Sequence, residues 1–155
     1  MQNRLLAAAL SVFTLATLAV VVVHGYQSGD GRRYIAPRTK ADANLPPFSG
    51  AVFAGNTLYL AGELGTDGNN KVPDNPDAEA KAVLDKIQAR LNAAGLTMDD
   101  LVSVQIFCSD VSLYPRFNEV YRTYFTREYP ARAFLGSGPL LFGAHFEVMG
   151  IAVKR

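Results

Sequence analysis

The chain has 155 residues, a net charge of +1 and a hydrophobic fraction of 49%, which fits one globular domain with at most a small appendage. Its lysines and arginines form no cluster, so the composition excludes the basic stripe typical of proteins that bind nucleic acids. Two histidines and one cysteine are too few for the usual zinc sites, and no carboxylate spacing resembles an EF-hand, so we expect no metal.

The N-terminal segment is the most apolar part of the chain. Residues 5–23 carry no charge and follow a single basic residue, Arg4. An apolar run of about 20 residues can cross a membrane as a helix, whereas the apolar stretch of a secretory signal has roughly 7–15 residues. We therefore expect residues 1–25 to be a cleaved signal peptide or a membrane anchor, with possible membrane contact through residues 5–23, rather than a buried helix. The protein would then be exported to the periplasm or another extracytoplasmic space, or anchored to the membrane.

The folded domain is expected to begin after a polar connecting segment. Residues 26–46 are interrupted by glycines and prolines, a composition that is typical of a linker or an extended arm. We therefore place the domain at residues 47–155. Its first two apolar runs, residues 51–54 and 57–61, flank the Gly-Asn pair at 55–56, which predicts a β-hairpin.

Two amphipathic helices are predicted next. The first begins after Asn75, which can cap its free N–H groups, and ends before Gly95, which favours the left-handed conformation that terminates helices. The second is predicted over residues 113–127. Apolar residues at helical spacing form its buried stripe: Phe117, Val120, Tyr121, Tyr124 and Phe125.

Three further strands are predicted at residues 101–108, 129–135 and 145–153, which gives the element order ββαβαββ. This order indicates an α+β domain in which two helices pack on one face of a mixed sheet. The more apolar face of the first of these strands should meet the helices, and it consists of Val102, Val104, Ile106 and Cys108.

The opposite face of the sheet should keep apolar side chains that one small domain cannot cover. We expect these exposed residues to include Leu58, Leu60 and Phe107. Because a large apolar surface in water favours association, we predict that the chain forms an oligomer through this face.

Arg132 and Glu147 are charged residues inside runs that otherwise predict buried strands. A charge is seldom taken out of water unless it is paired or functional. The two residues are therefore either a structural ion pair or the two ends of a small-molecule site, since a guanidinium can hold a carboxylate through two parallel hydrogen bonds. His145 is expected near a strand end rather than as a catalytic base, and Cys108 as a core residue.

Five segments together resemble the RidA/YjgF family of imine deaminases. They are residues 47–52, 58–62, 118–121, 130–132 and 147–153. The most specific part is a Pro-Ala-Arg motif that ends at Arg132 and is followed fifteen residues later by Glu147. The similarity spans residues 47–155.

The resemblance implies a chorismate-mutase-like fold, a homotrimeric barrel of sheets and sites in clefts between subunits. It implies that Arg132 binds the carboxylate of a small 2-imino acid and that Glu147 positions the water that converts the imine to a 2-keto acid and ammonia. It also implies backbone contacts from Phe134, a nearby Asn118, and no metal or organic cofactor. The remaining residues expected at the substrate are Phe48, Ala61 and Gly62.

The chain departs from the usual family residues near the implied site. Ala61 replaces a serine, Glu63 a glutamine, Phe48 a frequent tyrosine, Met149 a second acid and Leu141 a proline. These changes remove hydroxyl groups from the pocket rim and add a charge. They bear on substrate preference, whereas Arg132 and Glu147 are retained.

Three functions follow from these considerations. The first is hydrolysis of small 2-imino or enamine acids such as 2-iminopropanoate. The second is a non-catalytic envelope module that binds a small carboxylate or a protein in the same cleft, which the change at Ala61 favours. The third is RNA cleavage, an activity of some members of this family, which the near-neutral charge disfavours.

Overall fold

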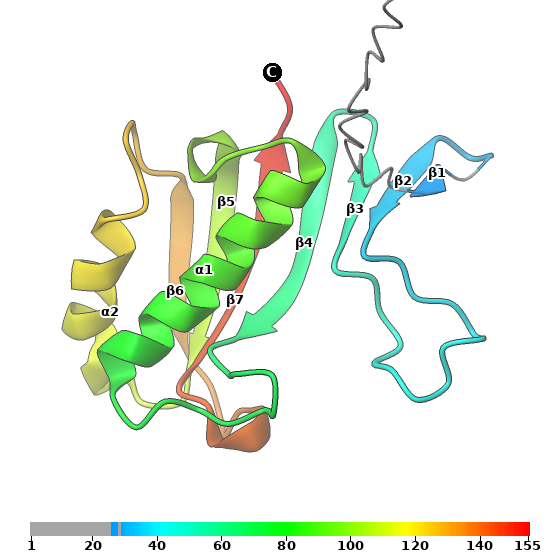
Figure 1. Cartoon of the computed structure of the whole chain (residues 1–155). Helices are drawn as coiled ribbons and strands as arrows, with labels where there is room; N and C mark the ends of the chain where they lie inside the picture. Colours follow the sequence, from blue (N-terminus) through cyan, green and yellow to red (C-terminus); the bar gives the residue numbers. More distant parts are fainter. Residues whose placement is uncertain (1–25, 28) are drawn as a thin grey trace, which may run out of the picture.

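The computed structural model describes residues 26, 27 and 29–155 (Figure 1). Its strands are β1 (Tyr26–Gln27), β2 (Arg32–Ile35), β3 (Ala51–Ala54), β4 (Thr57–Leu64), β5 (Leu101–Cys108), β6 (Ala131–Gly136) and β7 (Phe146–Val153). Its α-helices are α1 (Pro76–Ala94) and α2 (Tyr114–Arg122), and three short 3-10 helices are η1 (Met98–Asp100), η2 (Val111–Leu113) and η3 (Leu141–Gly143).

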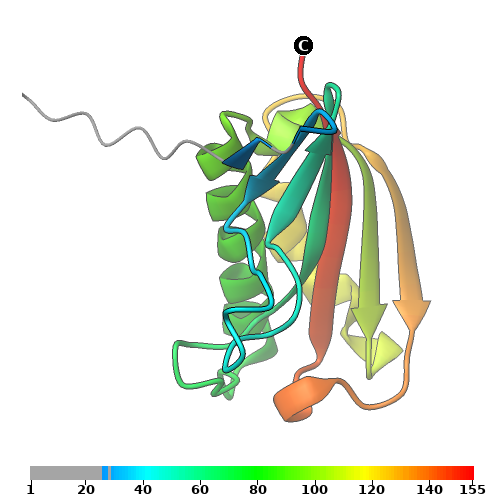
Figure 2. The same ribbon diagram turned by 90° about the vertical axis from the view of Figure 1, so that its right-hand side faces the viewer.

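The strands form one mixed sheet in the order β1-β2-β3-β4-β7-β5-β6. All neighbouring strands are antiparallel except β5 and β6, which run parallel. Both α-helices lie on one face of this sheet, and no described helix covers the opposite face, which we call the open face (Figures 1 and 2). The predicted α+β class, with a mixed sheet and two helices on one face, is confirmed, while the trimeric barrel stays a prediction consistent with this fold.

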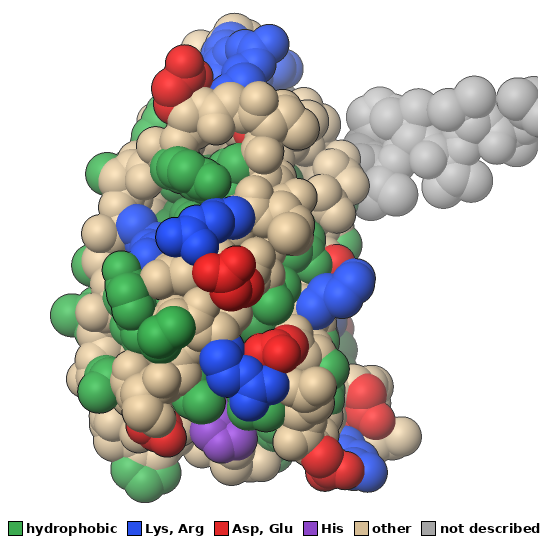
Figure 3. Space-filling view, turned by 90° about the vertical axis from the view of Figure 1, so that its left-hand side faces the viewer, with side chains coloured by type: hydrophobic (Ala, Val, Ile, Leu, Met, Phe, Trp, Pro, Cys, Tyr) green, Lys and Arg blue, Asp and Glu red, His purple; other side chains and the backbone are tan. Residues whose placement is uncertain are grey.

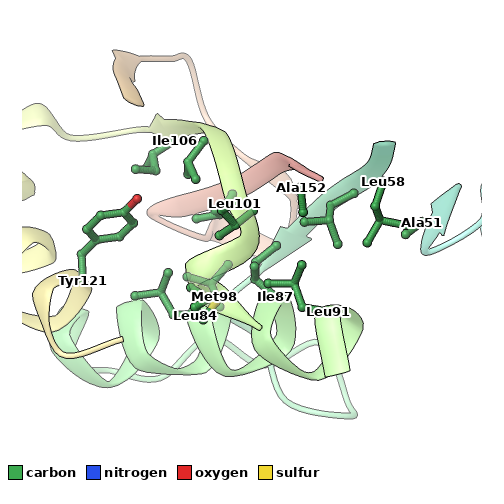
Figure 4. Packing of buried hydrophobic residues seen from close by; sticks show 14 of the residues in the cluster. Ala51, Leu58, Leu84, Ile87, Leu91, Met98, Leu101, Ile106, Tyr121 and Ala152 are labelled. Carbon is green, nitrogen blue, oxygen red and sulfur yellow. The ribbon is translucent and has the colours of Figure 1, made fainter. Parts of the chain in front are cut away.

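Helix α1 has the two ends that the sequence predicts. The Asn75 side chain accepts a hydrogen bond from the N–H of Asp77, and Pro76 occupies the first turn, where a missing N–H costs nothing. At the other end Gly95 adopts a left-handed conformation with a φ of 79°. The buried face of α1 packs on the sheet (Figure 4), and it consists of Glu79, Ala80, Val83, Leu84, Ile87, Leu91 and Ala94.

The β3–β4 hairpin forms as predicted, but its side chains point the other way. Leu58 and Leu60 are buried on the helix-covered face, so the prediction that they lie on the open face is wrong. Leu58 pairs in register with Phe53 and Ala152, which are both buried, and this pairing decides its direction. The open face instead exposes Tyr59 and Met149, with Phe107 partly buried beside them.

Strand β5 presents Val104, Ile106 and Cys108 to the helices as predicted, but it exposes Val102. The pairing of β5 with β7 shifts its register between Leu101 and Ser103, so Val102 is an extra residue at a bulge. Leu101 takes the buried place that the regular two-residue alternation assigns to Val102.

The segment 26–46, predicted as a linker or arm, contributes two strands to the sheet. Strand β2 pairs along its whole length with β3, and Ile35 is buried in the core. The Arg33 guanidinium lies 4.2 Å from the centre of the Phe53 ring and donates a hydrogen bond to the carbonyl of Ala94. The sheet therefore begins before residue 47, while the division of the chain into domains stays a prediction.

Helix α2 ends earlier than predicted, at Arg122. The next residue, Thr123, donates its hydroxyl to the carbonyl of Val120, and Thr126 is bound by the carboxylate of Asp99. These side-chain hydrogen bonds compete with helix continuation. The chain then turns toward β6, the strand that carries Arg132.

The Phe117 side chain is expected to be a main support of α2 on the sheet. It is fully buried, and its ring centre lies 4.8 Å from that of Phe146 and 5.7 Å from that of Phe134. We predict that Phe117→Ala lowers the free energy of unfolding by about 3–5 kcal/mol, measured by urea denaturation at a fixed protein concentration. The control Val111→Ala, at an exposed site, should change it by less than about 1 kcal/mol. Equal effects of the two substitutions would contradict this role.

Candidate functional site

Arg132 lies on β6, with its side chain on the helix-covered face of the sheet. This direction follows from its register, since Arg132 pairs with the buried Val104. Its Nη2 donates a 2.7 Å hydrogen bond to Oδ1 of Asn118 on α2. The guanidinium carbon lies 4.6 Å from the ring centre of Tyr121 and 5.8 Å from that of Tyr114. Residues one turn apart on α2 therefore hold Arg132 from several sides.

The guanidinium of Arg132 opens on a cavity of about 350 Å³, which we call the arginine pocket. Its other lining residues are Tyr114, Asn118, Tyr121, Arg122, Tyr129 and Pro130. Among the described residues no carboxylate forms an ion pair with Arg132, whereas the neighbouring Arg122 pairs with Glu119 at 2.8 Å. An arginine held in place without an acidic partner is suited to bind the carboxylate of a ligand.

The two tyrosines beside Arg132 have opposite pKa shifts. Burial raises the pKa of Tyr121 to about 12, while the positive charge of Arg132 acts in the other direction. The hydrogen bond with Asn118, together with the charge of Arg132, lowers the pKa of the exposed Tyr114. The Tyr121 ring extends from α2 toward Ile106 (Figure 4), and its buried hydroxyl has no hydrogen-bond partner in the described part of the chain.

Glu147 lies on β7, with its side chain on the open face. Its neighbours Phe146 and Val148 are buried on the helix-covered face, and successive side chains of a strand alternate. Gly62 on β4 lies so close that a Cβ there would overlap Oε1 of Glu147, so a side chain at position 62 would displace the Glu147 carboxylate from this position. None of the ion pairs in the described residues involves the Glu147 carboxylate.

The Glu147 carboxylate lines a second cavity, of about 540 Å³, which we call the glutamate pocket. Three apolar side chains on its rim are largely exposed: Phe48 by 55%, Leu141 by 70% and Phe142 by 58%. Glu63 also lines it, but its carboxylate is paired with Arg90 at 2.7 Å. The glutamate pocket therefore combines one carboxylate that lacks an ion-pair partner with an apolar rim and with the basic residues Arg38, Lys86 and Arg90.

The structure does not bring Arg132 and Glu147 together within one chain. They lie on opposite faces of the sheet, on strands that β5 separates. The two residues therefore form no ion pair within the described chain. A site that uses both must combine the arginine pocket of one chain with the glutamate pocket of another.

The other predicted site residues divide between the two pockets. Asn118 lies with Arg132, whereas Phe48 and Gly62 line the glutamate pocket. Ala61 lies next to Gly62 at a register shift of β4, where its N–H bonds to a backbone carbonyl. The Phe134 ring lines neither pocket, because it packs under Tyr114 at a ring-centre distance of 5.0 Å.

Sequence reasoning assigned the tyrosines of α2 to the core and missed their contact with Arg132. A usable signal was present, because Tyr114 and Tyr121 lie four residues before and three residues after Asn118. Such spacings place side chains on one face of a helix. No group of three or more His, Cys, Asp or Glu side chains in the described residues is arranged to hold a metal ion.

The comparisons with known proteins agree with this fold. A family model described as endoribonuclease L-PSP matches residues 39–154. The 2-iminobutanoate/2-iminopropanoate deaminase of Bos taurus is 35% identical over 124 residues, which is 79% of this chain and 90% of the relative. The corresponding protein of Mus musculus is 34% identical, again over 79% of this chain, and 92% of its own length is covered.

Solved structures of other proteins also match the fold of this chain. The crystal structure of RidA from the Antarctic bacterium Psychrobacter sp. matches with a TM-score of 0.67 and 32% identity, covering 71% of this chain and 90% of that one. The YjgF gene product of E. coli matches with a TM-score of 0.67 and 29% identity, covering 70% and 89%.

The prediction of export or membrane anchoring needs correction. Residues 1–25, including the apolar run 5–23, lie outside the described residues. In the part of the chain that the structure describes, no helix is long and apolar enough to cross a membrane. The bovine relative aligns over 90% of its own length, which leaves little room for a counterpart of that run. Neither finding supports an exported or anchored protein, and we correct the prediction accordingly.

We predict that Tyr121 makes the protein less stable at high pH. Its pKa is about 12 in the folded chain and about 10 in an unfolded chain, so between these values the unfolded state loses its proton first. The free energy of unfolding should therefore fall as the pH rises from about 10 to about 12, by at most about 1.4 kcal/mol per pH unit. Urea denaturation across this range should show a smaller fall in Tyr121→Phe. An identical slope in both proteins would refute the shift.

Proposed function

The chain belongs to the RidA/YjgF family, whose family model is described as endoribonuclease L-PSP, and we propose that it hydrolyses small 2-imino acids to 2-keto acids and ammonia. The observation that carries this proposal is the arginine pocket. Arg132 is fixed by Asn118 and two aromatic rings and has no acidic partner in the described chain. Such a group recognises the carboxylate that every 2-imino acid carries. The names of the bovine and murine relatives support this substrate class.

The chemistry requires only orientation and one activated water. Arg132 binds the substrate carboxylate, and Glu147 holds a water against the carbon of the C=N bond and accepts its proton. The electron pair of the C=N bond moves to nitrogen, which receives that proton. The water oxygen is now bonded to the tetrahedral carbon as a hydroxyl group. Transfer of the hydroxyl proton to the nitrogen lets the C–N bond break, which releases ammonia and leaves the 2-keto acid. Imines hydrolyse readily in water, so positioning of the reactants and transfer of two protons, first from the water and then from the hydroxyl, suffice.

The active site is proposed to form between protomers of a homotrimer. Each chain offers the arginine pocket beside one edge strand, β6, and the glutamate pocket with the open face. The outer edge of β6 has no partner strand among the described residues, and the open face exposes Tyr59 and Met149. Unpaired strand edges and exposed apolar faces both favour association. A cyclic assembly would cover these surfaces and place Arg132 of one protomer beside Glu147 of its neighbour.

The remaining site residues would shape the substrate cleft. In this proposal Phe48 and Gly62 line it on the Glu147 side, with Gly62 leaving space for the carboxylate. Ala61 and Phe134 would act through their backbone groups, since neither side chain lines a pocket. The Glu63 charge is already neutralised by Arg90, so it need not repel an anionic substrate. Met149, on the open face, would lie in the assembly contact rather than in the cleft.

A second candidate function is binding of a small carboxylate without turnover. The observation that favours it is Ala61, which removes a hydroxyl next to the glutamate pocket. Saturable binding of 2-keto acids in the absence of ammonia release would support it. RNA cleavage is disfavoured, because positive and negative side chains are mixed on the side of the molecule that carries α2 and β6 (Figure 3).

We predict that the two charged residues affect turnover differently. Arg132→Ala should reduce kcat/KM for freshly generated 2-iminopropanoate by about a hundredfold, mainly through KM, since a charged hydrogen-bonding partner is lost. Glu147→Gln should reduce kcat by about a hundredfold through loss of proton transfer. The measurement is ammonia release after subtraction of the spontaneous rate. Arg116→Ala, which removes an exposed arginine paired with Asp77, is the control and should keep the wild-type rate.

The shared site has a sharper test. At substrate concentrations below KM, Arg132→Ala and Glu147→Gln are each expected to keep about one hundredth of the wild-type rate. Mixed assemblies, in contrast, contain clefts with both native residues. After the two variants are unfolded together and refolded, about one quarter of the clefts of a cyclic trimer should regain activity. Mass measurement of the native assembly gives the number of protomers. No recovery in verified mixed trimers would show that the two residues do not act across a protomer contact.

A further inference from the structure

Glu79, in the first turn of α1, is the only charged side chain among the described residues that is buried. Its Oε1 accepts hydrogen bonds from the backbone N–H of His145 at 2.6 Å and of Phe146 at 3.0 Å. Its Oε2 lies 2.7 Å from Nδ1 of His145. A buried carboxylate is stable only when its oxygens are satisfied, and three nitrogen groups at the start of β7 surround this one.

Gly65, the residue that follows β4, also lies against Glu79. A Cβ on Gly65 would lie 2.5 Å from the carbonyl oxygen of Glu79 and 2.6 Å from its Cγ, so only a glycine allows this approach. Gly65 directly follows Leu64, the residue of β4 that pairs with Glu147. The two strands that flank the glutamate pocket are therefore both in contact with this one residue of α1.

We propose that Glu79 is a positioning residue for Glu147. The two N–H groups that Glu79 binds belong to His145 and Phe146, which immediately precede Glu147 in the chain. Glu79 thereby fixes where β7 begins and how its first residues are oriented. The inference rests on the proposed function, because it assigns Glu79 a part in holding the water-binding carboxylate in place.

The contacts of Glu79 also hold the loop that leads into β7. The chain reaches His145 from η3, whose residue Phe142 has a φ of 58° and lines the glutamate pocket. The carbonyl of His145 accepts a hydrogen bond from the N–H of Ser109, so His145 is bound from two sides. Without Glu79, the N–H groups of His145 and Phe146 would lose their acceptor, and the start of β7 would have to shift to find another.

In this proposal, the number and reach of the acceptor atoms on residue 79 matter more for holding the start of β7 than the charge of that residue. A glutamine can present one oxygen to both N–H groups and its amide N–H to the histidine ring. An aspartate keeps the charge, but its oxygens lie one carbon farther from β7. An alanine removes every contact. These three substitutions therefore separate the geometric role of Glu79 from its charge.

The test compares Glu79→Gln, Glu79→Asp and Glu79→Ala in the full-length assembly, with 2-iminopropanoate as substrate. A displacement of about 1 Å at a reacting group can cost up to about a hundredfold in rate. We therefore expect kcat to fall at least about tenfold in the aspartate and alanine variants while KM changes less than about threefold, and to stay within about threefold of wild type in the glutamine variant. Asp77→Ala, at an exposed carboxylate of the same helical turn, should behave as wild type.

Amide hydrogen exchange provides a readout that does not depend on turnover. The N–H groups of His145 and Phe146 should exchange faster in Glu79→Asp than in wild type or Glu79→Gln, while those of β5 stay protected. If Glu79→Ala does not fold, Glu79→Asp decides the question. A folded Glu79→Asp with wild-type kcat would overturn the positioning role. A wild-type protein without turnover would instead overturn the proposed function, and unchanged exchange in Glu79→Asp would then overturn the positioning of β7 as well.

Discussion

The alternation of side chains across one sheet determines what a single chain can do. Arg132 points in the same direction as Val104 and the core, whereas Glu147 points away from it. No rotation of a side chain can bring the two groups together, because the sheet itself lies between them. Each chain therefore holds two separate pockets, one around Arg132 with aromatic walls and one around Glu147 with an apolar rim. If Arg132 and Glu147 act together, as proposed, two chains must associate to form the site, so association would serve the reaction as well as cover apolar surface.

The elements with strong local signals were predicted well from the sequence. Asn75 and Gly95 mark the two ends of α1, because capping residues act within one turn of a helix. Gly55 forms the turn of the hairpin because a glycine can adopt a positive φ. The direction of Leu58 and the exposure of Val102 could not be predicted in the same way. Both depend on pairing with β7, far away in the sequence. For Val102, a register shift in that pairing also changes which residues face the helices.

The candidate site was predicted through family resemblance and not through pattern alone. Periodicity shows that Arg132 interrupts an apolar strand, but its contact with Asn118 depends on how α2 crosses the sheet. The contact between Glu79 and His145 joins residues 66 positions apart in the sequence. The spacing of hydrophobic residues does not indicate such a contact. From the sequence alone, an acidic residue in the first turn of a helix is explained by its favourable interaction with the helix dipole. Only the tertiary structure reveals that it binds the strand that carries Glu147.

The outer edge of β6 has a consequence for how the protein behaves at low abundance. In the proposed assembly, a protomer that dissociates would keep its arginine pocket but lose the Glu147 of its neighbour, and it would also expose an open row of backbone donors and acceptors. Dilution of the proposed assembly would therefore both lower the rate of turnover and produce free protomers that tend to aggregate through the edge of β6. A cell that makes this protein would benefit from synthesising it in amounts that keep free protomers scarce, and chaperones and proteases would meet mainly the unassembled fraction.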